Sequence, residues 1–401
     1  MQVNNENKVG YKLTSLGWIP KEWEIYPVGK AFNICNNLRF PINEDVRNSM
    51  TGSYPYYGPT RIQGFINEYR VEGKYALIGE DGDHFLKWKE LPMTLLVSGK
   101  FNVNNHAHLI QGNGISITEW FFYYFNHREL TTYLTRQGAG RYKLTKAALA
   151  KMPIPLPSLD EQSKITTILS TWDEAITKTQ ELITQLQRRN KGLMQQLLSG
   201  KKRLKGFENE WKPLKIYDVA KEVSLKNRDD KQLTVLSCTK YDGLVPSLEY
   251  FGRRVFGSDT STYKVVPKEH FAYATNHIEE GSIGYQDIFE EALISPMYTV
   301  FKTSEKVNDD FFYKLLKSHQ YIHQYCKRME GSIDRRGGLR WDEFSKIPVH
   351  LPPHKEQTAI ATIINKAMDD VKLQEQHLAS LQQQKKGLMQ KLLTGHVRVK
   401  I

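Results

Sequence analysis

The sequence predicts an α+β protein with two mixed, mainly β domains at opposite ends of an antiparallel two-helix coiled coil, related by a pseudo-twofold internal duplication. Three observations lead to this prediction. A long segment occurs twice, each copy has a seven-residue apolar period, and glycine-punctuated β-like stretches separate the copies. At about 150 residues per domain, 401 residues allow two or three domains with cores of their own. We expect the β-rich domains at residues 1–152 and 206–347, and the helical segments with their proline lead-ins at residues 153–205 and 348–401.

The repeated segment aligns without a gap at an offset of 195. Residues 151–205 recur as residues 346–400, and 21 of the 55 aligned pairs are identical. The strongest block is KGLMQQLLSG at 191–200, which recurs as KGLMQKLLTG at 386–395. A self-similarity of this length indicates a duplication.

Apolar residues in each copy recur at steps of three and four, which is the a/d seam of a coiled coil. Asn190 and Lys385 interrupt the two seams at equivalent positions, and they either set the register or lie near the ends where the seams open. Two duplicated helices that bury equivalent seams on each other must be related by a twofold axis, so we favour antiparallel pairing of the helices. The seam residues are Ile165, Leu169, Trp172, Ile176, Ile183, Leu186, Leu193 and Leu197 in the first copy, and Ile360, Ile364, Val371, Leu378, Leu381, Leu388 and Leu392 in the second.

Prolines and glycines delimit these helices. An extended lead-in is expected before each helix, and Gly200 and Gly395 provide the stops. The lead-in prolines are Pro153, Pro155 and Pro157, and then Pro348, Pro352 and Pro353. Between the helical segments, Thr94–Phe101 and Thr262–Thr275 alternate apolar and polar residues as strands do. Helices are expected around 119–134 and 309–328.

Charge and cysteine content narrow the classes of protein. The chain has 56 Lys and Arg against 44 Asp and Glu, a net charge of +12 that is compatible with nucleic acid but does not by itself require it. The first residues lack the pattern of an export signal, and no 18-residue window is wholly apolar, so we expect a cytoplasmic protein. Cys35, Cys238 and Cys326 lie far apart, which predicts reduced thiols rather than a disulfide framework or a zinc site.

The common catalytic motifs are absent from the sequence. Each Gly-Lys pair lacks the following Ser or Thr of a phosphate-binding loop, and neither a dinucleotide fingerprint nor a G-x-S-x-G elbow occurs. The [DNS]-P-P-[YFW] loop of an amino-methyltransferase is also missing. Residues 81–84, His106 and His108 could be imagined as metal ligands, but turn residues and a core histidine are the interpretation we favour. We therefore expect a chain that performs no bond-breaking step and binds no metal.

Polar and cationic clusters lie in loop-like stretches at equivalent places in both halves. Arginine forks and glutamine amides read base edges in the major groove, while lysines take phosphates. For a single residue, a solvated surface arginine is the simpler interpretation; for the clusters as sets, we favour DNA contact. The candidates are Tyr56, Tyr57, Arg61, Gln63, Arg136, Arg141 and Lys143 in the first half, and Arg253, Arg254, Arg335, Arg336 and Arg340 in the second.

This arrangement resembles the specificity (S) subunits of type I restriction-modification systems. The resemblance rests on two diverged domains alternating with two related helices, on the P-x-[PH]-L-P…EQ…I lead-ins at 153–165 and 348–360, and on the KGLMQ-[QK]-LL-[ST]-G helix ends. It spans the chain from about Gly17 to Gly395. It implies that each β-rich domain is a target recognition domain, which reads one half of a split, asymmetric site in double-stranded DNA.

The resemblance also implies the partners. The helices would space the recognition domains and dock two methyltransferase (M) subunits, and restriction (R) subunits would join through the M–S complex. S-adenosylmethionine, ATP and Mg would belong to those partners, which agrees with the missing motifs. The alternative is a basic coiled-coil adaptor that joins two protein-binding β-rich domains. A steep salt dependence of DNA binding combined with preference for one bipartite sequence would distinguish a specificity subunit from such an adaptor.

Overall fold

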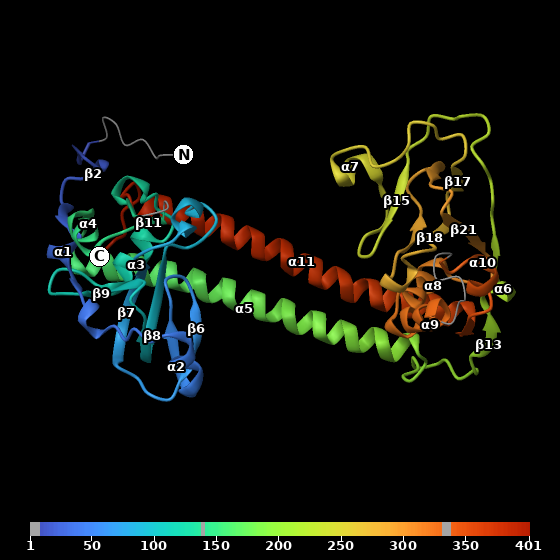
Figure 1. Ribbon diagram of the computed structural model, residues 1–401, viewed down its shortest axis with the longest axis horizontal. Coiled ribbons are helices and arrows are strands. Elements are labelled where there is room, and N and C mark those ends of the chain that lie inside the picture. Colours follow the sequence, from blue (N-terminus) through green and yellow to red (C-terminus); the bar gives the residue numbers. More distant parts are fainter. Residues whose placement is uncertain (1–8, 138–140, 331–337) are drawn as a thin grey trace. The chain divides into compact units, whose positions relative to one another are not determined.

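The computed structural model describes residues 9–137, 141–330 and 338–401. These divide into two compact units, which are described separately below (Figure 1). Unit 1 contains the described residues up to 180 together with 376–401, and unit 2 contains those from 181 to 375.

Unit 1 is built on a six-stranded sheet in the order β4-β9-β7-β8-β5-β6, antiparallel except for the β5–β8 pair (Figure 1). Side chains of β7 alternate between its two faces: Ala76 and Ile78 join the core that contains Phe121 of helix α3, and Leu77 belongs to a smaller core on the other face. The elements are β4 (Phe32–Ile34), β5 (Thr51–Tyr57), β6 (Ile62–Ile66), β7 (Val71–Gly79), β8 (Thr94–Val103), β9 (Ala107–Gly112) and α3 (Thr118–Phe125).

Unit 2 is built on a four-stranded sheet in the order β14-β21-β18-β19, with the pairs β15–β16 and β17–β20 beside it. The helices α8 and α9 bury Phe312 and Tyr325 in the same core as Phe271 of β18. The elements are β14 (Ala220–Glu222), β15 (Leu236–Thr239), β16 (Gly243–Pro246), β17 (Lys264–Pro267), β18 (His270–Ala274), β19 (Ile283–Gln286), β20 (Glu291–Ile294), β21 (Tyr298–Thr303), α8 (Asp309–Leu316) and α9 (His319–Glu330).

Both units have the same order of elements around the sheet. Strand order β4-β9-β7-β8 in unit 1 corresponds to β14-β21-β18-β19 in unit 2. In each unit the proline lead-in forms a short strand that pairs with the strand opening the domain: β12 with β3, and β22 with β13. Their bounds are β3 (Glu24–Pro27), β12 (Pro153–Leu156), β13 (Lys212–Lys215) and β22 (Pro348–Leu351). The duplication therefore extends into regions where the sequences have diverged.

Some predicted elements differ in extent. The alternating stretch at Thr94–Phe101 lies in β8, as predicted. The one at Thr262–Thr275 is two strands, β17 and β18, separated by a turn in which Glu269 has φ +61°. The helix expected to reach residue 134 ends at Phe125 and is followed by a 3₁₀ turn at Thr131–Tyr133. The expected 309–328 helix is broken into α8 and α9.

Two long helices follow the lead-ins: α5 (Leu159–Leu198) and α11 (His354–Leu392). In unit 1, Ile165 near the start of α5 shares a core with Leu392 at the end of α11. In unit 2, Leu197 near the end of α5 shares a core with Ile360 near the start of α11. Within each unit the two helical segments therefore run in opposite directions.

Both helices end in the same way. Gly200 and Gly395 have φ of +70° and +67°, a left-handed conformation that glycine adopts without steric penalty. The amide of Lys202 donates to the carbonyl of Gln196, and the equivalent bond joins Val397 to Lys391. Both stops predicted from the sequence are thus confirmed. Across the described ranges, no helix combines the length and apolar composition needed to cross a membrane.

Candidate DNA-recognition surfaces

The Glu-Gln pair at the start of each helix fixes the helix to its domain. The Nε2 of Gln162 donates to the carbonyls of Ile115 (3.0 Å) and Pro157 (2.9 Å), and its Oε1 accepts from the amide of Ile117 (3.1 Å). The side chain is fully buried, so three backbone groups that would otherwise be unsatisfied are paired through one amide.

Unit 2 repeats this arrangement. The Nε2 of Gln357 donates to the carbonyls of Lys306 (3.0 Å) and Pro352 (2.9 Å), while Oε1 accepts from the amide of Asn308 (2.8 Å). The start of each helix is therefore hydrogen-bonded to the domain that precedes it.

The predicted seam residues of both helices are all buried or half-buried. Ile165, Leu169, Ile183, Leu197, Ile360, Ile364 and Leu392 are buried, and Trp172, Ile176, Leu186, Leu193, Val371, Leu378, Leu381 and Leu388 are half-buried. The two polar interruptions have partners. Asn190 donates from Nδ2 to the carbonyl of Ala367 in unit 2, and Lys385 forms an ion pair with Asp173 in unit 1.

Among the DNA-contact candidates of the first half, Tyr56 is wrongly predicted. Its side chain is fully buried, and its hydroxyl donates to the carbonyl of Phe40 (2.7 Å) and accepts from the amide of Ile42 (3.2 Å). The alternation of β5 directs this ring into the protein, where DNA cannot reach it. Tyr57 is half-buried, with its ring edge-on to that of Phe101.

The other candidates of the first half lie on two hairpins. Arg61 and Gln63 are exposed at the β5–β6 turn, where Gln63 Oε1 accepts from Asn104 Nδ2 (2.9 Å). Arg136 and Arg141 are exposed on the hairpin of β10 (Thr135–Gln137) and β11 (Arg141–Lys143).

Lys143 enters a network around Glu80 at the end of β7. Its Nζ lies 3.2 Å from Glu80 Oε1, and Arg39 Nη1 lies 2.6 Å from Glu80 Oε2. Burial raises the pKa of Glu80, but the hydrogen bonds from Arg39 and Lys143 outweigh it and the pKa is lowered. The carboxylate is therefore charged and neutralised within the protein. No sequence pattern indicated a role for Arg39, which lies 41 residues from Glu80.

His108 is a core histidine, the interpretation favoured from the sequence. His108 is fully buried, its Nε2 donating to the carbonyl of Leu144 (2.7 Å) and its Nδ1 facing Asn36 Nδ2 (2.8 Å). His106 instead pairs with Asp81, with 2.9 Å between Nδ1 and Oδ2. In the described part of the chain, His, Cys, Asp and Glu side chains gather closely enough to hold a metal at His277, Glu279 and Glu280, a surface turn.

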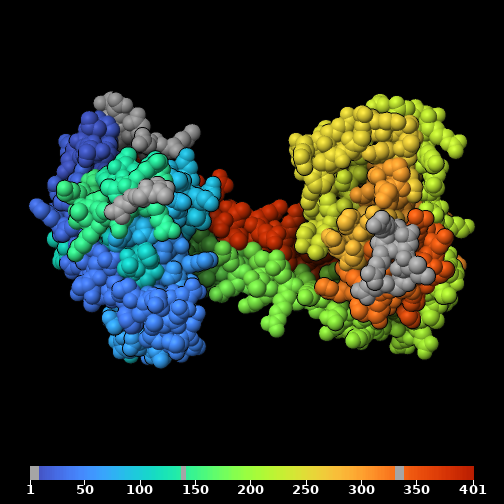
Figure 2. Space-filling model, viewed as in Figure 1, coloured from blue at the N-terminus to red at the C-terminus, as the bar shows by residue number. Residues whose placement is uncertain are grey.

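Candidates of the second half occupy two segments. Arg253 and Arg254 are exposed after α7 (Ser247–Phe251), and Arg254 donates to the carbonyl of Gly257 (3.1 Å). In Figure 2 this stretch forms part of the surface of unit 2, in yellow. Arg340 is exposed and precedes α10 (Trp341–Phe344). Arg335 and Arg336 lie outside the described residues.

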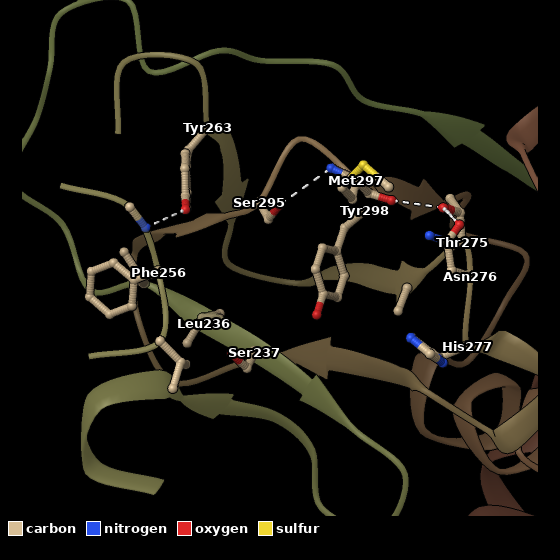
Figure 3. Close-up of a pocket in the computed structure, with 14 residues that line it drawn as sticks. Leu236, Ser237, Phe256, Tyr263, Thr275, Asn276, His277, Ser295, Met297 and Tyr298 are labelled. Atoms are coloured by element: carbon tan, nitrogen blue, oxygen red, sulfur yellow. Dashed lines mark hydrogen bonds between the residues drawn. The ribbon is translucent and has the colours of Figure 1, made fainter. Parts of the chain in front are cut away.

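A pocket of about 370 Å³ lies in unit 2 beside the segment that follows Arg254 (Figure 3). Val255 and Phe256, which follow the arginine pair, form one side. Asn276 and His277, which follow β18, form another, with Met297 and Tyr298 beside them. The pocket thus combines apolar side chains with amide, imidazole and hydroxyl groups, the mixture that contacts base edges and thymine methyl groups. None of these lining residues was predicted from the sequence.

Comparison with known proteins decides the family. A model of the type I restriction modification DNA specificity domain matches residues 20–188 and again residues 208–383. The chain belongs to this family of type I specificity subunits. The resemblance deduced from the repeated motifs is therefore confirmed, and the chain carries two DNA specificity domains.

Individual relatives of this specificity subunit span nearly its whole length. A candidate type I restriction enzyme specificity subunit of Haemophilus influenzae is 27% identical over 86% of this chain and 87% of its own. The type I restriction enzyme MjaVIII specificity subunit of Methanocaldococcus jannaschii is 23% identical over 95% and 94%.

The fold of the specificity subunit also matches solved structures. The S subunit of a type I restriction-modification system from M. genitalium superposes with a TM-score of 0.58 at 14% identity, covering 97% of this chain and 98% of that one. The HsdS subunit from Thermoanaerobacter tengcongensis gives a TM-score of 0.51, also at 14% identity, over 94% and 98%.

Proposed function

We propose that this chain is the non-catalytic DNA-recognition subunit of a type I restriction-modification complex, and that each of its specificity domains reads one half of a bipartite, asymmetric site. The observation that carries the proposal is the twofold match to the specificity-domain family, on two units with the same order of elements. Exposed arginines in both units and the net charge of +12 suit a phosphate backbone.

The long helices act as spacer and docking surface in this proposal. We infer that they pair along their length as an antiparallel coiled coil with one domain at each end, since the helical segments within each unit run in opposite directions. A 40-residue helix such as α5 is about 60 Å long at 1.5 Å per residue. Two M subunits would dock on this pair, and R subunits would join through them.

Chemistry in this proposal belongs to the partners. S-adenosylmethionine would bind the M subunits, and ATP and Mg would serve the R subunits. The carboxylates around the candidate surfaces are instead engaged in pairing: Glu80 with Arg39 and Lys143, and Asp81 with His106. This chain supplies binding and orientation.

The test is DNA binding by the complex of this chain with its M subunit. A duplex that contains the sequence methylated in the host should bind the complex at least about 1,000-fold more tightly than a duplex of scrambled sequence. Binding to both should weaken steeply as salt is raised, because bound phosphates release counterions. Equal affinity for the two duplexes, or methylation by the chain without its M subunit, would contradict the proposal.

A further inference from the structure

The two recognition domains contain the same backbone frame at the end of a central strand. In unit 1, the last register pair of β7 and β9 is Gly79 with Ala107, so Glu80 lies beside His106. In unit 2, the last register pair of β18 and β21 is Ala274 with Tyr298. Thr275 and Met297 therefore occupy the positions of Glu80 and His106.

A backbone hydrogen bond at the same place in each unit supports the equivalence of the two strand ends. The amide of Leu144 donates to the carbonyl of Glu80 at 2.7 Å, and the amide of Leu339 donates to the carbonyl of Thr275 at 2.9 Å. Leu144 follows Lys143, and Leu339 precedes Arg340. In both domains, a segment that carries candidate phosphate or base contacts is thus tied by its backbone to the same strand end.

Close approach in unit 2 depends on Gly338. Its φ is +64°, and a Cβ there would lie 2.5 Å from both Asn276 Oδ1 and the carbonyl oxygen of Thr275. A side chain at this position would push the segment away from the strand end.

Side chains on this shared frame differ between the domains. Unit 1 presents Asp81 paired with His106, whose side chain is 44% exposed. Unit 2 presents Asn276 and Met297, and Met297 is 58% exposed. Figure 3 shows Asn276, His277 and Met297 around the pocket of unit 2. At this exposure the thioether of Met297 is accessible to a ligand from solvent.

We propose that the strand-end positions are the base-reading sites of the two domains: Asp81 and His106 in unit 1, and Asn276 and Met297 in unit 2. The proposal rests on the proposed function and adds the residues that distinguish the two half-sites. A common frame places the residues at equivalent points, and their different chemistry selects different bases.

The chemistry of each set matches base edges in the major groove. The amide of Asn276 can accept and donate at once, which fits adenine, and the methyl group of Met297 suits the methyl group of thymine. The carboxylate of Asp81 can accept from an exocyclic amine, and the imidazole of His106 has donor and acceptor capacity. In unit 1 the pairing of Glu80 with the cations of Arg39 and Lys143 limits the repulsion of phosphates.

The test exchanges the two sets within the full chain, purified with its M subunit. The variant Asn276→Asp with Met297→His introduces the unit 1 pair into unit 2, and Asp81→Asn with His106→Met does the reverse. His323→Ala and Gln320→Ala, at exposed positions of α9, are the matched controls. Methylated sites are sequenced after reaction with a duplex library randomised over the motif, and thermal melting checks that each variant is folded.

Each exchange should change base preference by about 10-fold or more at positions of one half-site only, a different half-site for each variant. The controls should keep the parental motif. Unchanged preference in both folded exchange variants would overturn this assignment while leaving the proposed function intact. A variant that no longer methylates is tested by binding competition with duplexes altered at one position, and equal weakening for every duplex would also overturn it. A wild-type complex without a split motif would instead refute the proposed function.

Discussion

Arg203 and Glu356 form a two-point ion pair in unit 2, with 2.8 Å for both Nε–Oε1 and Nη2–Oε2. Arg203 follows the end of α5, and the Glu356 carboxylate is fully buried in the first turn of α11. Unit 1 contains the same pair with the helices exchanged. Arg398, which follows α11, bonds to Glu161 in the first turn of α5 at 2.7 and 3.0 Å. Each helix end therefore holds the start of the other helix.

Removing Arg203 should destabilise unit 2. The variant Arg203→Met keeps the aliphatic stem but leaves Glu356 buried and unpaired, and the cost should be about 3–5 kcal/mol of unfolding free energy. Urea denaturation measures the decrease, and hydrogen exchange should locate it at the start of α11. Lys346→Met, which breaks an exposed pair with Glu343, is the control and should leave the midpoint unchanged. Equal stability of Arg203→Met and wild type would show that the pair contributes nothing.

Mild acid should destabilise unit 1. Burial lowers the pKa of His84, His108 and His127, so the folded unit favours their neutral forms. Between about pH 6.5 and the lowered values, the unfolded chain binds more protons, and the free energy of unfolding must fall as pH falls. Urea midpoints measured at pH 7.5 and 5.5 should show this decrease. His108→Gln should reduce the slope and the exposed control His323→Gln should not. A midpoint independent of pH would contradict the prediction.

Replacing Arg335 and Arg336 with Ala should weaken specific binding by about 1–3 kcal/mol for each arginine that hydrogen-bonds to a base. Because both residues belong to the second recognition domain, the weakening should map to one half-site. Competition with duplexes altered in one half-site or the other measures this. If both half-sites weaken equally and the salt slope falls, these arginines bind phosphates and the base-reading role is wrong.

The seven-residue period and its repetition were sufficient to predict the two long helices and the duplication. A seven-residue repeat copied at an offset of 195 identifies the seam, and the left-handed glycines at 200 and 395 follow from local backbone chemistry. The Arg203–Glu356 pair was missed, although Arg and Glu recur at the same offset, because charged residues outside the apolar period carry no signal of burial. Identical residues in both copies could have indicated it.

Recognition surfaces were harder to predict because they depend on long-range strand pairing. Tyr56 belongs to a polar, Gly-rich stretch, yet strand alternation turns it into the core. Asn276 and Met297 are 21 residues apart in sequence that contains no recognisable motif, and both line one pocket because β18 pairs with β21. The number of cationic residues follows from composition. The placement of Asn276 and Met297 at one pocket can be predicted only when the register of the sheet is known.

The central claim is that each half of the chain is a complete recognition unit. A chain truncated after Lys205 keeps the first recognition domain and one helix, and two copies should pair their exposed seams. Arg203 of one copy would then bond to Glu161 of the other, as Arg398 does in the intact chain. Arg203→Ala in the truncated chain should therefore weaken the dimer, and sedimentation measures this directly.

The decisive measurement is the methylated motif produced by the truncated chain with its M subunit. The two copies would be related by a true twofold axis, and each would present the same domain to one half-site. The motif should therefore be palindromic, and both half-sites should carry the sequence read by residues 1–152. A dimer that still methylates the parental asymmetric site, or a fragment that remains monomeric, would contradict the account.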